Sequence, residues 1–393
     1  MICSSSTSSI STPPPMLPPE ILLAIVNELV SDRRTLLDLL FVSRQFHSLA
    51  LQPLYHEIAF RMDRPDESLI KKLCSLARNA ERNPGMRFTT SFSFVLKGHR
   101  AAPPNLFYEM EEAIKRIVPA LSAVRRICLS MHASVNAQIL WPLPVGAPLT
   151  HLRVHECSLK SEYLRRFLSS RPALQSLEID CFPYGTWRMN IVPYKLPPGS
   201  FPPLRSLSVP LRELAYFETP PPSLINLDLS EPTYALERNP ETLRQLIMPF
   251  TSIRALSFSN VLLFSVSLLP QLPNLEYLRL DETFVRCCPP CHISYAFGIT
   301  QAKPMIHGLL TTTRLKYIRC LESEDLGHDV FGASGTLVVA DIASRRDHTY
   351  RMCRGVDDSV PLNDHWDEWE GWWERAQRAV TNAERSSLSM SRV

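Results

Sequence analysis

Residues 17–58 read LPPEILLAIVNELVSDRRTLLDLLFVSRQFHSLALQPLYHEI, and this stretch predicts a small module of three helices. Pro18 and Pro19 suit the first turn of a helix, where a missing N–H group costs nothing. Apolar residues then recur at helical spacing as far as Leu29. The first helix is therefore expected to be amphipathic and to end before Ser31-Asp32.

Two further helices are predicted after this break. Thr35 is a candidate N-cap for the second helix, and Ser43 is one for the third. Pro53 is expected to end the third helix, because the residue before a proline disfavours the helical region. The second helix carries too many apolar residues for one covered face, and three short helices cannot enclose a self-sufficient core. Part of this module is therefore expected to bind a partner.

Two short segments of the module carry a family resemblance. Leu17–Leu22 (LPPEIL) and Val42–Phe46 (VSRQF), at this interval, resemble the F-box. In that family the module docks on the Skp adaptor, which links it to a cullin scaffold and so to ubiquitin transfer. The resemblance implies that seven residues contact or support a Skp-type adaptor: Leu17, Pro18, Ile21, Leu22, Leu39, Val42 and Phe46. The alternative is that the same leucines close a helical cap over the next domain.

Composition limits the remaining function classes. The chain has 393 residues, of which 45% are hydrophobic, so it is expected to be globular with two or three domains. Lys and Arg number 42 against 39 Asp and Glu, a balance that gives no support for nucleic-acid binding. Proline is frequent at 34 residues and glycine scarce at 12, so the loops lack the glycines that phosphate cradles need.

The sequence predicts an intracellular protein, cytoplasmic or nuclear. Residues 1–15 are rich in Ser, Thr and Pro and lack the apolar segment of a signal peptide, so they are expected to form a disordered tail. The longest apolar stretch, Val261–Leu269, is about half as long as a bilayer span requires, so no membrane partner is expected. Ten cysteines in a chain of this kind fit reduced thiols better than a disulfide framework.

A repeated pattern organises the rest of the chain. The motif apolar-x-x-apolar-x-apolar begins at Val124, Leu149, Leu174, Leu204, Leu224, Ile253, Leu275 and Leu315. Most of these intervals fall in or near the period of roughly 20 to 29 residues that is typical of leucine-rich repeats. A lone strand and helix cannot bury their apolar sides, whereas stacked units form a continuous core. The sequence therefore resembles an irregular leucine-rich-repeat solenoid, with an ordinary α/β sheet as the alternative fold.

The predicted fold class is α/β, with a helical F-box-like module followed by this solenoid and a C-terminal capping helix. The expected organisation is a tail at 1–15, the module at 16–60, a linking helix at 61–84, the repeat domain at 85–360, the capping helix at 361–380 and a flexible tail at 381–393. Polar residues that alternate with the strand leucines are expected to bind a client protein. They are Arg153, Glu178, Asp228, Arg254 and Arg279.

The C-terminal helix is predicted from its tryptophans. Residues 364–379 hold four of the six tryptophans, and Leu362, Trp366, Trp369 and Trp373 share one helical face. This face is expected to pack against the last repeats and to cap them, with an aromatic client-binding surface as the alternative. Trp372 lies off the stripe and is expected to be exposed.

No metal or cofactor is expected. The segment Cys287–His292 contains one C-x-x-C pair, and no second pair follows at the spacing of a zinc site. His151 and His155 lie on a predicted strand, where four residues span about 13 Å, too far for joint coordination. Both observations favour structural roles for these side chains.

No enzyme signature is found either. Gly332–Gly335 fits neither a nucleophile turn nor a phosphate loop and is expected to be a turn into a strand. The carboxylates between Glu322 and Asp325 lack a partner acid or base and are expected to be solvated. The resemblance to the F-box implies that the function is substrate recognition within a Skp–cullin–F-box (SCF) ubiquitin ligase. The alternatives are a repeat-containing scaffold or receptor without a ligase, and a catalytic site between Cys287 and His307.

Overall fold

The computed structural model describes 17 segments of the chain. They are residues 17–63, 66–96, 104–131, 137–155, 166–180, 202–209, 214, 220–229, 245, 247, 249–259, 272–281, 314–321, 334–343, 349–354, 360–361 and 372–390. The predicted features that fall wholly outside these segments are the tail at 1–15, the apolar stretch at 261–269, the C-x-x-C segment at 287–292 with the alternative catalytic region at 287–307, and the carboxylates at 322–325.

The three predicted helices of the N-terminal module are present. They are α1 (Pro19–Glu28), α2 (Arg33–Leu39) and α3 (Arg44–His56). The Ser43 hydroxyl caps α3 as predicted, accepting a hydrogen bond from the Phe46 N–H at 3.2 Å. The predicted cap of α2 was wrong, because the Asp32 carboxylate accepts from the Arg34 and Thr35 N–H groups at 3.1 and 3.2 Å. A carboxylate at this position also complements the helix dipole.

The prediction that Pro53 ends the third helix was also wrong. Helix α3 continues through Pro53 to His56. Proline removes one backbone hydrogen bond, but Leu51 and Leu54 on either side of it are buried. Packing of these leucines keeps the last turn helical, since most helix stability in proteins comes from tertiary contacts.

A single sheet of 13 strands follows the module, with its strands in chain order. The strands are β1 (Glu57–Met62), β2 (Ser91–Leu96), β3 (Arg126–Ser130), β4 (His151–His155), β5 (Ser176–Asp180), β6 (Ser206–Ser208), β7 (Asn226–Leu229), β8 (Ala255–Ser259), β9 (Tyr277–Asp281), β10 (Tyr317–Leu321), β11 (Val339–Ala343), β12 (Thr349–Cys353) and β13 (Val360–Pro361). Strands β1 to β11 pair in parallel, and β12 and β13 are antiparallel.

The eight repeated motifs coincide with strands β3 to β10, so their strand positions are confirmed. Of the predicted turn at Gly332–Gly335, only Ser334 and Gly335 are described. They lead into β11, and the Ser334 hydroxyl accepts a hydrogen bond from the Leu337 N–H at 3.1 Å. Strand β1 was missed, since the sequence assigned its last residues to a linking segment. The helix of that segment is α4 (Glu67–Asn79).

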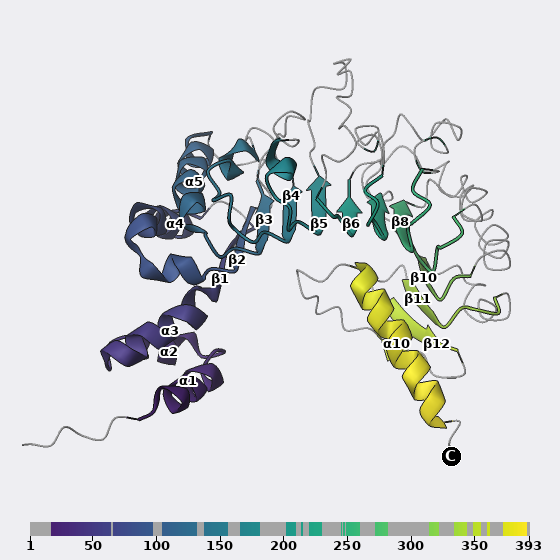
Figure 1. Cartoon of the computed structure of the whole chain (residues 1–393), viewed down its shortest axis with the longest axis horizontal. Coiled ribbons are helices and arrows are strands. Elements are labelled where there is room, and N and C mark those ends of the chain that lie inside the picture. Colours follow the sequence, from purple (N-terminus) through teal and green to yellow (C-terminus); the bar gives the residue numbers. More distant parts are fainter. Residues whose placement is uncertain are drawn as a thin grey trace, which may run out of the picture.

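The strands follow an arc (Figure 1). Helices α4 and α5 (Pro104–Ile117) lie on its outer side, together with four short 3-10 helices: η1 (Ala80–Arg82), η2 (Pro84–Phe88), η4 (Val118–Ala120) and η5 (Ala137–Leu140). The main core is on this outer side, where Phe92, Ile127 and Leu152 alternate along the strands with residues of the opposite face. That opposite side of the sheet is called the inner face below.

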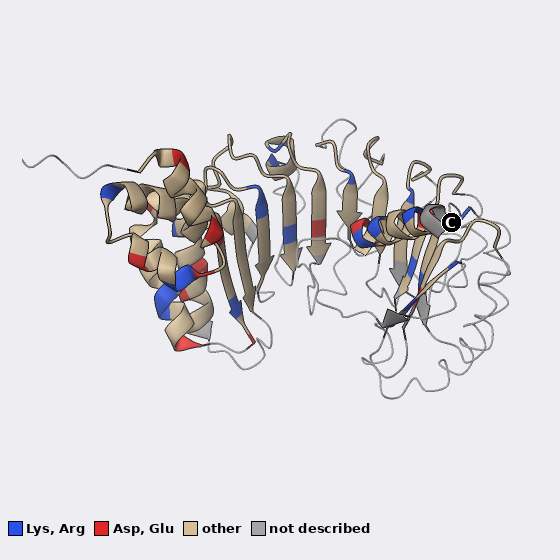
Figure 2. Cartoon of the chain, turned by 90° about the horizontal axis from the view of Figure 1, so that it is seen from below, with Lys and Arg blue, Asp and Glu red and all other residues tan. Residues whose placement is uncertain are grey.

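Helix α10 (Trp372–Met390) lies on the inner face (Figures 1 and 2). Its residues Trp372, Ala376, Ala379 and Val380 form a second apolar cluster with Ala255, Tyr277, Tyr317 and Val339 of strands β8 to β11. The helix therefore covers the face of the last parallel strands and does not lie at the end of the sheet, which is formed by β12 and β13.

Two details of the predicted C-terminal helix differ. Trp372 was expected to be exposed and is only 6% exposed. The helix also continues to Met390, because Ala379, Val380 and Ala383 extend its apolar stripe beyond the tryptophans. Leu362, Trp366 and Trp369 lie outside the described residues. None of the described helices has the length and apolar character of a membrane-spanning segment.

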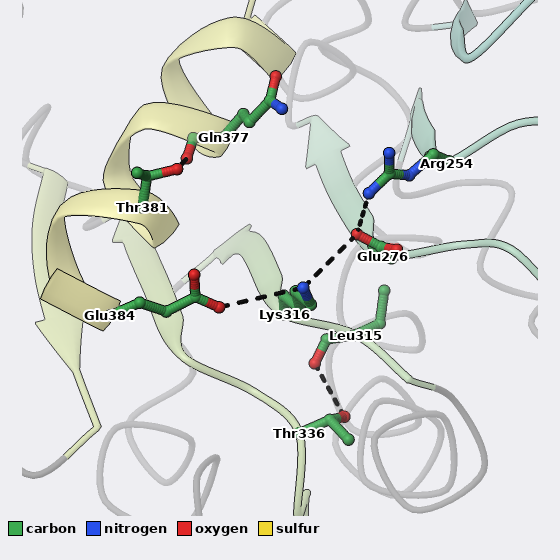
Figure 3. Close-up of polar contacts among 8 residues, drawn as sticks. All are labelled: Arg254, Glu276, Leu315, Lys316, Thr336, Gln377, Thr381 and Glu384. Atoms are coloured by element: carbon green, nitrogen blue, oxygen red, sulfur yellow. Dashed lines mark hydrogen bonds and ion pairs between the residues drawn. The ribbon is translucent and has the colours of Figure 1, made fainter. Parts of the chain in front are cut away.

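A chain of charged side chains runs along one edge of α10 (Figure 3). Arg254 contacts Glu276 at 2.7 Å, Glu276 lies 4.0 Å from Lys316, and Lys316 lies 4.0 Å from Glu384 of the helix. The Lys316 and Glu384 side chains are 41% and 49% exposed, and exposed pairs of this kind stabilise by about 0 to 1 kcal/mol. Apolar contacts therefore hold α10 in place.

We predict that Ala376→Glu detaches α10 from the sheet. Ala376 is fully buried, so the variant places an unpaired charge in an apolar cluster and should lose about 2 kcal/mol or more. Amide hydrogen exchange in residues 372–390 measures the loss of protection. The matched control Glu384→Ala removes the exposed ion pair with Lys316 without placing a charge in the apolar cluster, and it should leave exchange unchanged. Equal loss of protection in the two variants would contradict the apolar account.

Candidate functional site

The N-terminal module carries an unusual concentration of exposed apolar side chains. Eleven large hydrophobic residues are exposed among the described residues, and eight of them lie between positions 17 and 42. The eight are Leu17, Ile21, Leu23, Ile25, Val30, Leu37, Phe41 and Val42. Exposed apolar surface gathered in this way marks interaction sites in folded proteins.

The module leaves this surface uncovered because its own core is small. Val26, Leu36, Ala50 and Leu54 form its buried cluster, and Leu22 and Leu51 are the other buried apolar residues of its three helices. Three helices of 10, 7 and 13 residues have too few turns to cover both faces of α1 and α2. The uncovered side chains form what we call the module surface, namely the eight exposed residues named above.

The seven residues assigned to adaptor binding divide into two groups. Leu17, Pro18, Ile21 and Val42 are exposed and lie on or beside the module surface. Leu22 is 3% exposed, and Leu39 and Phe46 pack against the core of the module. The second group therefore supports the fold of the module, while the first is available to a partner.

Sequence reasoning missed five residues of the module surface: Leu23, Ile25, Val30, Leu37 and Phe41. Phe41 is the most exposed of them, at 88%. The signal that could have found Leu37 and Phe41 is the apolar excess between positions 36 and 42, since a short helix that buries Leu36 turns Leu37 outward.

A second candidate surface is formed by the inner face of the sheet. Because the parallel strands share one register, side chains of this face line up in rows across them. The first row contains Arg126, His151, Ser176, Ser206, Asn226, Ala255, Tyr277, Tyr317 and Val339. The second contains Cys128, Arg153, Glu178, Ser208, Asp228, Ser257, Arg279, Arg319 and Asp341.

The chemistry of the first row changes where α10 begins to cover it. Ala255, Tyr277, Tyr317 and Val339 are apolar or aromatic and contact the helix cluster. The residues of the same row on β3 to β7 are all polar. Helix α10 thus covers the apolar part of the inner face (Figure 2). Strands β3 to β7, which lie beyond that cluster, carry its polar part.

Tyr317, Asp341 and Arg351 form a hydrogen-bond network on the last strands. The Tyr317 hydroxyl donates to Asp341 at 2.6 Å, and the Arg351 guanidinium donates to both oxygens of the same carboxylate at 2.8 and 2.7 Å. Burial, followed by the charge of Asp341, raises the pKa of Tyr317 well above its usual value. This network stabilises the packing of the last strands.

The polar part of the inner face contains a charged cluster on β4 and β5. The Arg153 Nε donates to Glu178 Oε2 at 2.5 Å, and His155 Nε2 lies 3.1 Å from Glu178 Oε1. Burial of Glu178 would by itself raise its pKa, but the hydrogen bond from His155 and the charge of Arg153 outweigh burial and lower the pKa to about 2. Glu178 is therefore ionised at neutral pH and holds both basic side chains in place.

His151 has a different environment on the same strand. Burial, and then the charges of Arg126 and Arg153, lower the pKa of its imidazole. His151 is therefore neutral at pH 7, and its Nδ1 lies 2.9 Å from the Thr150 hydroxyl. Within the described part of the chain, no three His, Cys, Asp or Glu side chains come together as a metal site requires.

The five residues assigned to client binding are not all equivalent. Arg153, Glu178 and Asp228 lie in the second row on β4, β5 and β7, in the polar part of the inner face. Arg279 shares that row, and its charge, together with burial and the charge of Arg319, lowers the pKa of Arg375 on α10 to about 10. The charge of Arg153 acts in the same way on Glu374 of α10, where it opposes the rise in pKa that burial causes, so both arginines lie within electrostatic reach of the helix. Arg254 precedes β8, lies outside both rows and pairs with Glu276. Their client roles stay predictions.

The comparison with protein families agrees with the N-terminal geometry. Residues 15–61 match the family described as F-box-like, so the chain carries an F-box-like domain there. No curated protein matches the chain. Among solved structures, the chain is similar to a crystal structure of a Rad7 and Elc1 complex in yeast, with 13% identity over 78% of this chain and 84% of that one. The TM-score is 0.33, too low to establish a common fold.

We predict that Glu178→Gln lowers stability at pH 7 by about 2 kcal/mol, because it removes a charge paired with Arg153 and His155. Since the pKa of Glu178 in the folded chain is below its ordinary value of 4.5, the stabilisation is present above pH 4.5 and is lost as the pH falls toward 2. Urea unfolding at several pH values measures the difference. A difference that stays constant down to the lowest pH at which the chain folds would contradict this assignment.

Proposed function

We propose that this chain is a substrate-recognition subunit of an SCF-type ubiquitin ligase. In this proposal helices α1 to α3 bind a Skp-type adaptor, and through it a cullin, while the inner face of the sheet binds a client protein. The observation that carries the proposal is a coincidence of two independent features. The residues that match the F-box-like family, 15–61, include all eight residues of the module surface.

The proposed adaptor interface is apolar. Leu17, Ile21 and Val42 are 50%, 47% and 62% exposed in the free chain, and Phe41 is 88% exposed. Complete burial of one such side chain contributes about 1.5 to 3 kcal/mol, so a few of them account for stable association. Leu22, Leu39 and Phe46 act indirectly, by fixing the helices that present this surface.

The proposed client-binding domain is an irregular leucine-rich-repeat-like solenoid. Support comes from the strand order, since β1 to β11 are parallel neighbours in chain order, and from the leucine motifs on β3 to β10. A stack of this kind presents one side chain per strand in each row of its inner face, which suits the recognition of an extended surface.

The proposed client site is the polar part of the inner face, on β3 to β7. Helix α10 covers the apolar part of this face on β8 to β11, and Tyr317 and Asp341 beneath it are hydrogen-bonded to each other. Arg153, Glu178 and Asp228 are the assigned residues that lie in this region. Arg279 and Arg254 belong to the neighbourhood of α10 and are assigned a peripheral role.

The proposed activity is recognition without catalysis by this chain. A client held on the inner face has its lysines at a high effective concentration beside the transfer machinery, and this proximity accelerates ubiquitin transfer without any bond being made by the chain itself. The role requires no cofactor in this chain. It also implies an intracellular location, cytoplasmic or nuclear, where the ligase operates.

We predict that Ile21→Asp, combined with Leu17→Ala and Pro18→Ala, reduces adaptor affinity at least about tenfold, since a charge would enter an apolar interface. Co-purification of the full chain with a Skp adaptor measures the loss, and circular dichroism establishes that the variant is folded. The matched control is Val145→Asp, which introduces the same charge at another exposed apolar residue, 73% exposed and outside the module.

The controls separate the proposal from its main alternative. Wild type and Val145→Asp should both retain the adaptor. If wild type fails to bind any Skp-type adaptor, the module is an end cap, and the chain is a repeat-containing scaffold or receptor that works without a ligase.

A second prediction concerns Phe41, which the sequence did not assign. Phe41→Ser should leave stability within about 0.5 kcal/mol, because the ring is already in water, and should weaken adaptor binding about tenfold. Leu22→Ala, by contrast, should lower the stability of the chain by about 2 to 4 kcal/mol, since Leu22 is buried. Calorimetric titration and urea unfolding of both variants measure the two effects. Unchanged adaptor affinity in Phe41→Ser would place Phe41 outside the interface.

A further inference from the structure

The helical module continues into the sheet without a linker. Helix α3 ends at His56, and strand β1 begins at Glu57. Strand β1 then pairs with β2 over six residues, from Glu57 opposite Ser91 to Met62 opposite Leu96. The last turn of α3 is therefore fixed at one end by the sheet itself.

Tyr55 joins the two hydrophobic cores. Its side chain packs against the core of the module and also against the main core on the outer side of the sheet. Only one turn of α3 separates it from Leu51 in the module, and only two residues lie between it and the buried Ile58 of β1. A rotation of the module about the α3–β1 junction would move this ring out of one core or the other.

Helix η2 holds the Tyr55 ring from the other side. The Asn83 Nδ2 donates to the Tyr55 hydroxyl at 2.7 Å, and the Asn83 Oδ1 accepts from the Gly85 N–H at 2.9 Å. A Cβ atom added at Gly85 would lie 2.4 Å from the ring carbon Cδ2 of Tyr55. The glycine is required here by space, since no side chain fits between the η2 backbone and the ring.

Backbone contacts reinforce the same junction. The Thr90 N–H donates to the His56 carbonyl at 3.0 Å, and the Arg33 guanidinium of α2 donates to the Leu54 carbonyl at 3.3 Å. Contacts from both sides therefore meet on the three residues Leu54, Tyr55 and His56.

We propose that Tyr55, Asn83 and Gly85 form a clasp that fixes the orientation of the module relative to the sheet. The role of this clasp rests on the proposed function. A fixed junction would hold the client-binding inner face at a constant position relative to the bound adaptor. The three residues are positioning residues and contact neither the module surface nor the inner face.

The test measures orientation directly in the full chain. Spin-labelled non-canonical residues replace Glu28 on α1 and Arg205 before β6, both exposed, and pulsed electron paramagnetic resonance gives the distance distribution between them. Wild type should give one narrow distribution. Gly85→Ala should shift or broaden it, because the new methyl group displaces the Tyr55 ring. The matched control is Gly146→Ala, where an added Cβ meets nothing within 4 Å, and its distribution should equal that of wild type.

A milder variant keeps the test decisive if Gly85→Ala does not fold. Tyr55→Phe removes only the hydrogen bond from Asn83 and should broaden the distribution at a temperature where the chain is fully folded. A wild-type distribution in Tyr55→Phe and in every folded Gly85→Ala sample would overturn the clasp. The measurement uses the free chain, so a failure of adaptor binding would refute the proposed function and leave this result standing.

Discussion

The parallel register of β1 to β11 is the constraint on which the rest of the structure depends. Because every strand pairs with its neighbour in chain order, each motif places its apolar residues on the outer side and its intervening residues on the inner face. The outer residues join one continuous core, from Phe92 on β2 to Ile318 on β10. The inner residues align in rows, and this alignment brings Arg153 and His155 onto Glu178 from a neighbouring strand.

The same register separates the two candidate surfaces and relates them in space. The module joins the sheet at its first strand, and α10 covers the inner face at the last parallel strands. The polar inner face of β3 to β7 lies between them (Figure 1). An adaptor on the module surface and a client on the inner face would therefore bind to different parts of the chain, connected through the α3–β1 junction at Tyr55.

Sequence reasoning succeeded where one physical requirement dominated each residue. The strand motifs were located correctly because buried leucines must recur on every strand of a stack. It failed where tertiary packing outweighed local preference. Pro53 lies within α3 because the flanking leucines are buried. Trp372 is buried because α10 packs on a face that only the folded sheet creates. The rows of the inner face could not be predicted, because they depend on the pairing register between strands, which the sequence of one strand does not encode. Arg254 was therefore grouped with Arg153, since both are polar residues beside strand leucines, although Arg254 precedes β8 and lies outside both rows.

The central claim is that the module surface is the binding site for a Skp-type adaptor. Hydrogen–deuterium exchange of the full chain, with and without a purified Skp adaptor, tests it most directly, because it maps the contact without any substitution. The account predicts slower exchange in residues 17–46 and unchanged exchange on β3 to β5. Unchanged exchange in residues 17–46 at saturating adaptor, or protection confined to the inner face, would contradict it.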